Sequence, residues 1–391
     1  MTNEFLPFSK PTIDQATIDE VVNCLKSGWI TTGPRVQKFA SMLKEYLGAK
    51  HALPLLSGTA GLQLALMSLN LKPDDEVIVP AFTFVASANT VIHAGGKPVF
   101  VDVDLTTRNI TAEFIEPAIT AKTRAIMPVH FAGLSVDLDP IYALAKKYNL
   151  RVIEDAAQAI GATYKNKKIG SFGDTQVFSF HPNKNMTTGE GGCVTTSDDE
   201  VAHQVEILRF HGIDRTDAWN RFSKSGSQHY DVPVAGFKYN MMDIQAALGL
   251  HQLPQLDEFN QRRTQLAHRY LEKLKNWPQF DLPEDPTHYE HNHIWHLFNP
   301  LLNLEQAHMT RDIFLEKMKD KNIGIGFHYD AVHLFSYYQK TFGYKVGDFP
   351  HAENISSRIM SLPLFPTMTE SIQDHVMDTM QTVFEEALMH A

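Results

Sequence analysis

The stretch VIEDAAQ, residues 152–158, joins a short β-branched run to an acid and then to small residues. Four further apolar runs of this kind lie between residues 50 and 200, at 77–79, 99–101, 125–127 and 176–180. Between them, apolar residues recur at helical spacing, as at Leu62, Leu66 and Leu69 and again over 141–148. Strands that alternate with helices predict an α/β domain with a mostly parallel sheet covered on both faces.

The pattern changes after about residue 240. Residues 243–274 read as one long helix, and an amphipathic stretch at 310–321 separates two short apolar runs, 296–298 and 323–327. We therefore expect a large domain with an N-terminal arm over residues 1–245, and a small C-terminal α/β domain over residues 246–391.

The composition narrows the function classes. The chain has 35 basic and 45 acidic side chains, a net charge of −10 that repels phosphate backbones, so we expect no nucleic-acid partner. No basic segment precedes an apolar one near the start and no apolar stretch is long enough to span a bilayer, so we expect no export and no membrane partner. Two cysteines, Cys24 and Cys193, cannot form a disulfide framework, which fits a cytoplasmic location.

Residues 57–61, SGTAG, open the helix that carries Leu62 and Leu66. Small residues at a helix start leave backbone N–H groups accessible, and the hydroxyls of Ser57 and Thr59 add donors. This arrangement suits a phosphate group. An ordinary helix cap explains the same residues, so the segment by itself leaves both readings open.

Asp155 ends the strand that VIEDAAQ predicts, where an unpaired buried carboxylate would be costly. A cation should therefore meet it, and a protonated pyridine nitrogen would serve; a salt bridge or a helix cap is the alternative. Lys184 follows the strand over 176–180 and precedes the small residues TTGEGG, 187–192. A desolvated lysine becomes a nucleophile, whereas a solvated one is only a surface charge.

Read together, these segments resemble the DegT-type sugar aminotransferase family. The resemblance covers almost the whole chain, through SGWITTGP (27–34), PAFTFVASAN (80–89), IEDAAQ (153–158), the lysine segment (178–192), GFKYNMMDIQAA (236–247) and LPLFP (362–366). It implies an aspartate-aminotransferase-like fold, the type I fold of pyridoxal-phosphate (PLP) enzymes.

The resemblance also implies roles for single residues. Lys184 would carry PLP as a Schiff base and shuttle protons, and Asp155 would pair with the pyridine nitrogen. The other cofactor-binding residues implied are Gln158 near the ring hydroxyl, Phe84 against the ring face, and Gly58, Thr59, Ala60 and Ser179 around the phosphate. Asn240 would reach the phosphate of the neighbouring subunit's cofactor, so we expect a homodimer with shared active sites.

The substrates implied are L-glutamate, which leaves as 2-oxoglutarate, and a nucleotide-linked 4-keto sugar. Three segments resemble those of the branch of the family that aminates a UDP-4-keto-pentose for lipid A: FLPFSKP (5–11), HIWHLF (293–298) and GIGFHY (324–329). Segment 212–234, by contrast, resembles the wider family. In that context Trp29 and His328 are expected to contact the sugar.

Three alternatives stay open at this level. The chain could aminate another keto sugar or a cyclitol, or it could be a non-catalytic PLP-binding regulatory protein. His288, His291, His293 and His296 could be read as a metal site, but four ligands within nine residues leave little freedom for tetrahedral closure, and we expect no metal.

Overall fold

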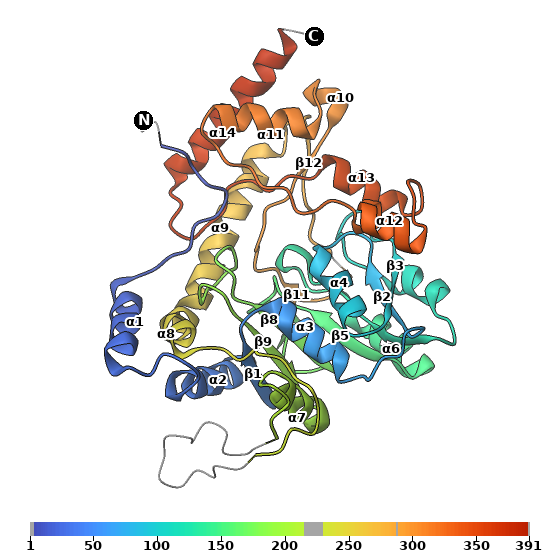
Figure 1. Ribbon diagram of the computed structural model, residues 1–391. Coiled ribbons are helices and arrows are strands. Elements are labelled where there is room, and N and C mark those ends of the chain that lie inside the picture. The colour runs from blue at the N-terminus through green and yellow to red at the C-terminus, as the bar shows by residue number, and fades with distance from the viewer. Residues whose placement is uncertain (1–3, 215–229, 287, 390–391) are drawn as a thin grey trace.

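The computed structural model describes residues 4–214, 230–286 and 288–389 (Figure 1), so most of segment 212–234 lies outside the described residues. Its centre is a seven-stranded sheet in the order β1-β9-β8-β5-β4-β2-β3. The strands are β1 (His51–Leu55), β2 (Glu76–Pro80), β3 (Lys97–Val101), β4 (Thr123–Ile126), β5 (Arg151–Asp155), β8 (Thr175–Ser179) and β9 (Gly192–Thr196).

The sheet is mostly parallel, as the sequence predicts. From β3 through β2, β4 and β5 to β8 each pair is parallel, and only β9 runs antiparallel to its neighbours β8 and β1. Strands β1 and β9 were not predicted from the sequence pattern. Strand β9 is fully buried yet ends in two threonines, whose hydroxyls donate to Gln176 Oε1 (3.1 Å, from Thr195) and to the Asp174 carbonyl (2.9 Å, from Thr196). Cross-strand bonds of this kind allow polar residues in a strand interior.

Helices cover both faces of the sheet, and two adjacent residues of β5 show this directly. Consecutive side chains of a strand point to opposite faces. The Tyr142 hydroxyl of α6 (Leu138–Tyr148) donates to Glu154 over 2.6 Å, whereas Ser87 of α4 (Val85–His93) donates to Asp155 over 2.7 Å. Helices α6 and α4 therefore lie on opposite faces, and Asp155 points to the α4 side.

The remaining elements of this part surround the sheet (Figure 1). Helix α3 (Gly58–Met67) packs across β5, β8 and β9, and α7 (Asp199–Leu208) packs on β1 and β9. Helices α1 (Gln15–Ser27) and α2 (Pro34–Leu47) pack on α8 (Asp243–Gln252). Short elements complete it: α5 (Ala112–Ile115), η1 (Glu116–Ala118), η2 (Phe131–Gly133) and a three-stranded sheet of β6 (Thr163–Tyr164), β7 (Lys167–Lys168) and β11 (His291–Asn292).

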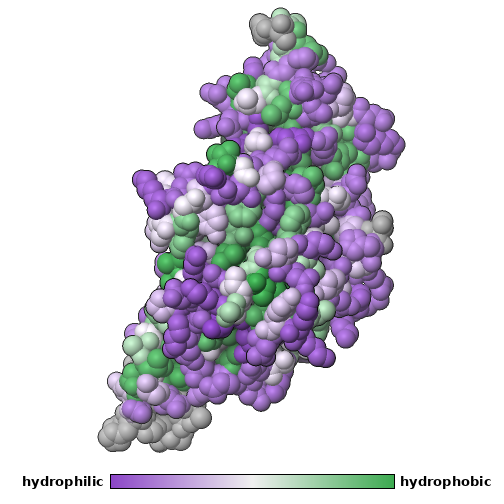
Figure 2. All heavy atoms as spheres, turned by 90° about the vertical axis from the view of Figure 1, so that its right-hand side faces the viewer, coloured by the Kyte–Doolittle hydropathy of each residue, from purple (hydrophilic) through white to green (hydrophobic). Residues whose placement is uncertain are grey.

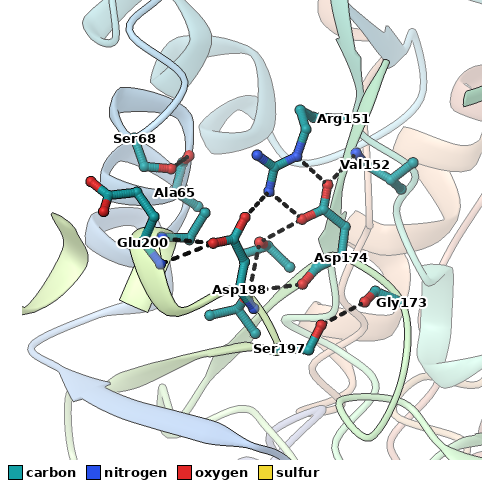
Figure 3. A network of polar contacts seen from close by, with 12 residues as sticks. Ala65, Ser68, Arg151, Val152, Gly173, Asp174, Ser197, Asp198 and Glu200 are labelled. Atoms are coloured by element: carbon teal, nitrogen blue, oxygen red, sulfur yellow. Dashed lines mark hydrogen bonds and ion pairs between the residues drawn. The ribbon is translucent and has the colours of Figure 1, made fainter. Parts of the chain in front are cut away.

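A polar network joins the amino ends of β5 and β8 to the start of α7 (Figure 3). Arg151 donates from Nε and Nη2 to the two Asp174 oxygens, each over 2.6 Å, and Nη2 also reaches Asp198 at 3.2 Å. Asp198 caps α7 by accepting from Glu200 and Val201. Bidentate pairs of this kind fix the relative orientation of the two groups. The network therefore holds the amino ends of the strands together, whereas Asp155 lies at the carboxyl end of β5.

A second hydrophobic core lies among α9, α11 and α14, in the upper part of Figure 1. Its elements are α9 (Leu256–Leu274), β10 (Phe280–Asp281), β12 (Leu301–Leu302), α10 (Leu304–Ala307), α11 (Arg311–Asp320) and α14 (Glu370–Leu388). By contrast, η5 (Val332–Leu334), α12 (Ser336–Phe342) and α13 (Pro350–Arg358) pack on the first core, where the rings of Tyr338 and Phe100 lie 5.3 Å apart. The domain division at residues 245 and 246 stays a prediction.

Two expectations for the C-terminal part are wrong in detail. The helix predicted over 243–274 is interrupted by the 3-10 turn η4 (Leu253–Gln255), because Pro254 cannot continue the helical hydrogen bonds. Residues 296–298 and 323–327, which we expected as short strands of the small domain, form isolated bridges instead: Phe298 to Leu362, Ile323 to Leu6 and Gly326 to Ser361. Glycines weaken a strand, and a Cβ on Gly324 would lie 2.8 Å from the Phe5 ring, so this segment packs as irregular chain.

The face of the molecule in Figure 2 is largely hydrophilic, with hydrophobic groups gathered in its middle. Within residues 4–214, 230–286 and 288–389, no helix has the length and apolar character needed to cross a membrane.

Candidate active site

A cavity of about 330 Å³ lies at the carboxyl ends of the parallel strands, just after Asp155 of β5 and at Ser179 of β8. Ligands gather at this edge of α/β sheets because the loops that follow the strands converge there. The cavity is lined by Ser57, Gly58, Thr59, Leu62, Thr83, Phe84, Ala86, Val129, Asp155, Ala157, Gln158, Ser179, His181, Asn183, Lys184, Glu190, His328 and Tyr329.

The Asp155 carboxylate is buried and has a donor on each oxygen. Ser87 Oγ donates to Oδ2 over 2.7 Å, and the backbone N–H of Ala157 donates to Oδ1 over 3.1 Å. Burial raises the pKa of Asp155 above its ordinary value, and both hydrogen bonds and the nearby Lys184 oppose that rise and favour the ionised form. Its side chain thus presents a carboxylate to the cavity, where a cationic group can meet it.

Lys184 lies in the turn after β8, where its backbone N–H donates to the His181 carbonyl over 2.8 Å. Burial lowers the pKa of Lys184 to about 8, with the negative charge of Asp155 opposing that shift. A lysine with this pKa is partly neutral near neutral pH, which makes its Nζ a nucleophile and a proton carrier.

The amino end of α3 forms one wall of the cavity. Ser57 caps the helix by accepting from the Ala60 N–H over 3.1 Å, while Gly58 and Thr59 line the cavity. A Cβ on Gly58 would lie 3.0 Å from Ser179 Cβ, so a glycine lets the helix start approach β8 closely. Accessible N–H groups at a helix start favour an anion.

Two aromatic rings and an amide form the other side. The Phe84 ring, about half exposed, lies 5.5 Å from the Tyr329 ring. Gln158 accepts from the Ala132 N–H over 2.7 Å and donates from Nε2 to the Tyr329 hydroxyl over 2.9 Å. His328 lies 2.7 Å from Ser361 Oγ through Nδ1, and burial lowers the pKa of His328 to about 4, so the ring is neutral.

The structure brings most of the expected site residues together: Gly58, Thr59, Phe84, Asp155, Gln158, Ser179, Lys184 and His328. Three expected residues do not line the cavity. The N–H of Ala60 is bound to Ser57, and the Trp29 indole donates to the Thr32 carbonyl over 3.1 Å. Asn240 donates to Thr32 Oγ1 over 2.6 Å and accepts from Lys238.

Residues that the sequence analysis did not single out also matter here. Tyr329 lines the cavity and follows His328 directly, so its place beside a predicted site residue could have indicated it from the sequence. Thr83 precedes the N-cap of α4 and Ser87 lies in its first turn, and their hydroxyl oxygens are 3.0 Å apart.

The histidine-rich stretch has structural contacts. His293 stacks on Trp295 with ring centroids 4.0 Å apart, and His296 Nδ1 lies 3.0 Å from Asn185 Oδ1. Among the described residues, no three His, Cys, Asp or Glu side chains are placed to hold a metal ion.

The fold and the lysine-bearing cavity are those of a PLP-dependent aminotransferase. The chain belongs to the DegT/DnrJ/EryC1/StrS aminotransferase family, which residues 11–381 match. The spore coat polysaccharide biosynthesis protein SpsC of Bacillus subtilis is 45% identical over 386 residues, 98% of each chain.

Solved structures agree with this assignment. The putative sugar aminotransferase Spr1654 from Streptococcus pneumoniae, in its PLP form, superposes with a TM-score of 0.88 at 32% identity, covering 98% of this chain and 99% of that one. A PMP form of the same protein matches equally well, with a TM-score of 0.88. Helicobacter pylori PseC, an aminotransferase of pseudoaminic acid biosynthesis, gives a TM-score of 0.89 at 29% identity, covering 98% and 100% of the two chains. PLP is the cofactor of this enzyme.

Proposed function

We propose that this enzyme transfers the amino group of L-glutamate to the keto carbon of a nucleotide-linked 4-keto sugar, with PLP bound through Lys184. The observation that carries the proposal is that Lys184, Asp155 and the amino end of α3 border one cavity. PLP has an aldehyde, a pyridine nitrogen and a phosphate, which would be met by Lys184, Asp155 and the amino end of α3 in that order. The three groups come from separate segments of the chain.

The residues fit PLP in chemical character. Lys184 Nζ would bind the aldehyde carbon, Asp155 would face the ring nitrogen, and Gly58, Thr59 and Ser179 would hold the phosphate. Phe84 would lie against the ring face, and Gln158 would lie near the ring hydroxyl. When bound, the cofactor supplies an electron sink for the carbon that loses its proton.

The chain's own groups then do the remaining work. Asp155, whose two donors favour its ionised form, would hold the ring nitrogen positive. Lys184 Nζ would take the proton from the α-carbon of glutamate and deliver it on the cofactor side, and reverse these transfers for the sugar. The neutral His328 would contact the sugar.

The relatives support a sugar substrate used in a surface polysaccharide, since SpsC is named for spore coat polysaccharide and PseC for pseudoaminic acid. A UDP-4-keto-pentose and a role in lipid A stay narrower predictions, as do a cytoplasmic location, Trp29 as a sugar contact and Ala60 as a cofactor contact. Because Asn240 lies outside the cavity of its own chain, we infer that it acts in the site of a second copy, within a homodimer.

One experiment tests the covalent link. The PLP-saturated enzyme is reduced with borohydride, digested and mapped by mass spectrometry; we expect the modification on the peptide that contains Lys184. A modified peptide from elsewhere would overturn the assignment. The substrate class is then tested by assaying glutamate against UDP-, dTDP- and GDP-linked 4-keto sugars, with a non-nucleotide cyclitol ketone as the contrasting substrate.

A further inference from the structure

Ser87 has a buried hydroxyl that the proposed mechanism does not use. It lies in the first turn of α4, is fully buried, and bonds on one side to Asp155 Oδ2 at 2.7 Å and on the other to Thr83 Oγ1 at 3.0 Å. Thr83 is also buried and lines the cavity, so both hydroxyls are withdrawn from bulk water.

The direction of these two bonds follows from the groups involved. An ionised carboxylate only accepts hydrogen bonds, so Ser87 must give its single proton to Asp155. The Ser87 oxygen is then left as an acceptor, and the proton between Thr83 and Ser87 must come from Thr83. The result is a one-way chain of donors from Thr83 through Ser87 to Asp155.

The second oxygen of Asp155 receives a backbone donor, the N–H of Ala157 at 3.1 Å. With one donor on each oxygen the plane of the carboxylate is defined, and lone pairs remain free toward the cavity. Ser87 is the side-chain half of this arrangement, and it can be removed without changing the backbone.

We propose that Ser87 is a positioning residue for the reaction: its hydroxyl, oriented by Thr83, holds the Asp155 carboxylate ionised and aimed at the cofactor's ring nitrogen. This inference rests on the proposed function for the role of Asp155. It adds that segment 83–87 would contribute to the ring site in two ways, since Phe84 would lie at the ring face and Ser87 would act through Asp155 at the ring nitrogen.

Other titratable groups interact electrostatically with Asp155, and His130 does so from the opposite face of the sheet, where it binds Glu154. Lys184 comes from the turn after β8, His130 from the loop after β4, and Tyr329 from the segment before η5. The charges of Lys184 and His130 lower the pKa of Asp155, as the Ser87 bond does, while burial raises it. A test must therefore remove the hydroxyl and leave these three groups in place.

The test is the titration of Asp155 in the full-length chain, with and without PLP. Aspartate labelled with ¹³C at the carboxyl carbon is followed by NMR against pH, and Asp155→Asn identifies the signal. In Ser87→Ala we expect the Asp155 midpoint to rise by about one pH unit, since a hydrogen bond to a charged group is lost. We also expect kcat to fall about tenfold while KM for glutamate changes little.

Two further variants separate positioning from folding. Thr83→Val should give a smaller shift in the same direction, and Thr83→Ser, which keeps the hydroxyl, should restore the normal midpoint. Ser135→Ala is the matched control, because Ser135 is also fully buried but its hydroxyl has no hydrogen-bond partner among the residues that the structure describes.

The proposal fails if Asp155 titrates in Ser87→Ala as it does in the unaltered chain, or if Ser135→Ala shifts it equally. This outcome is distinct from failure of the proposed function, which would appear as borohydride trapping of PLP away from Lys184 in the unaltered enzyme.

Discussion

Gln158 donates its side-chain amide to the hydroxyl of Tyr329 over 2.9 Å, and this bond joins the loop after β5 to the segment before η5. Its carbonyl oxygen is held separately, by the Ala132 N–H at 2.7 Å. The orientation of a residue expected beside the cofactor is thus set by a tyrosine 171 positions away in the chain.

Tyr329→Phe should remove the acceptor and leave the buried Gln158 donor unpaired. We expect the free energy of unfolding to fall by about 1 kcal/mol, measured by urea unfolding followed by circular dichroism. Tyr337→Phe, at an exposed tyrosine, is the control and should change stability little. Equal effects of the two substitutions would contradict the importance of the bond.

Asp155→Ala should reduce turnover much more than cofactor affinity. The carboxylate matters most as negative charge develops on the substrate carbon, so we expect kcat to fall by at least about a hundredfold. The dissociation constant of PLP, measured by fluorescence titration, should rise less. Near-normal turnover would refute the ring-nitrogen role of Asp155.

The pH dependence of PLP attachment follows from Lys184. Because burial lowers the pKa of Lys184 to about 8, attachment to the cofactor-free protein should accelerate as pH rises through about 8 and then level off. Asp155 opposes that shift, so Asp155→Ala should move the midpoint to lower pH. Stopped-flow absorbance measures both curves. A rate that kept rising toward the ordinary lysine value of 10.5 would contradict a buried amine.

The same shift affects stability. Between about pH 8 and 10.5 the unfolded chain binds the Lys184 proton and the folded chain does not, so this group makes the cofactor-free protein more stable as pH rises through that window. Lys184→Met should remove this component from the pH dependence of unfolding.

Subunit mixing tests the role of Asn240. Lys184→Ala and Asn240→Ala should each be inactive alone, whereas a mixture that exchanges subunits should recover about a quarter of the activity, since half the dimers carry one intact site. If each chain used its own Asn240, no activity would return. Size-exclusion chromatography with light scattering verifies that dimers form.

Asp174→Ala should destabilise the protein without affecting catalysis. It removes the bidentate Arg151 contacts and the acceptor for the Val152 N–H at 3.1 Å (Figure 3), and we expect a loss of about 1–3 kcal/mol in unfolding free energy. The control is Asp74→Ala, since Asp74 is exposed and its ion pair with Lys122 spans 3.8 Å. An unchanged KM for glutamate is expected, because the network lies at the opposite edge of the sheet from the cavity.

The amino-acid sequence alone determined the alternation of strands and helices and the segments that carry chemistry. Local pattern is enough for both: apolar runs such as 152–153 favour buried strands whatever surrounds them, and Asp155 and Lys184 follow such runs at the edge where parallel strands end. The family resemblance, carried by long motifs in fixed order, then gave the cofactor.

Only the tertiary structure decided which side chains meet. The antiparallel strand β9 has threonines that become acceptable in the interior through bonds to Gln176 and Asp174, residues that are remote in sequence. The same holds for Ser87 on Asp155 and Tyr329 on Gln158, which are joined across 68 and 171 positions. Hydrogen bonds between residues so far apart in the sequence depend on how the elements pack. Packing is a property of the whole chain rather than of any segment within it.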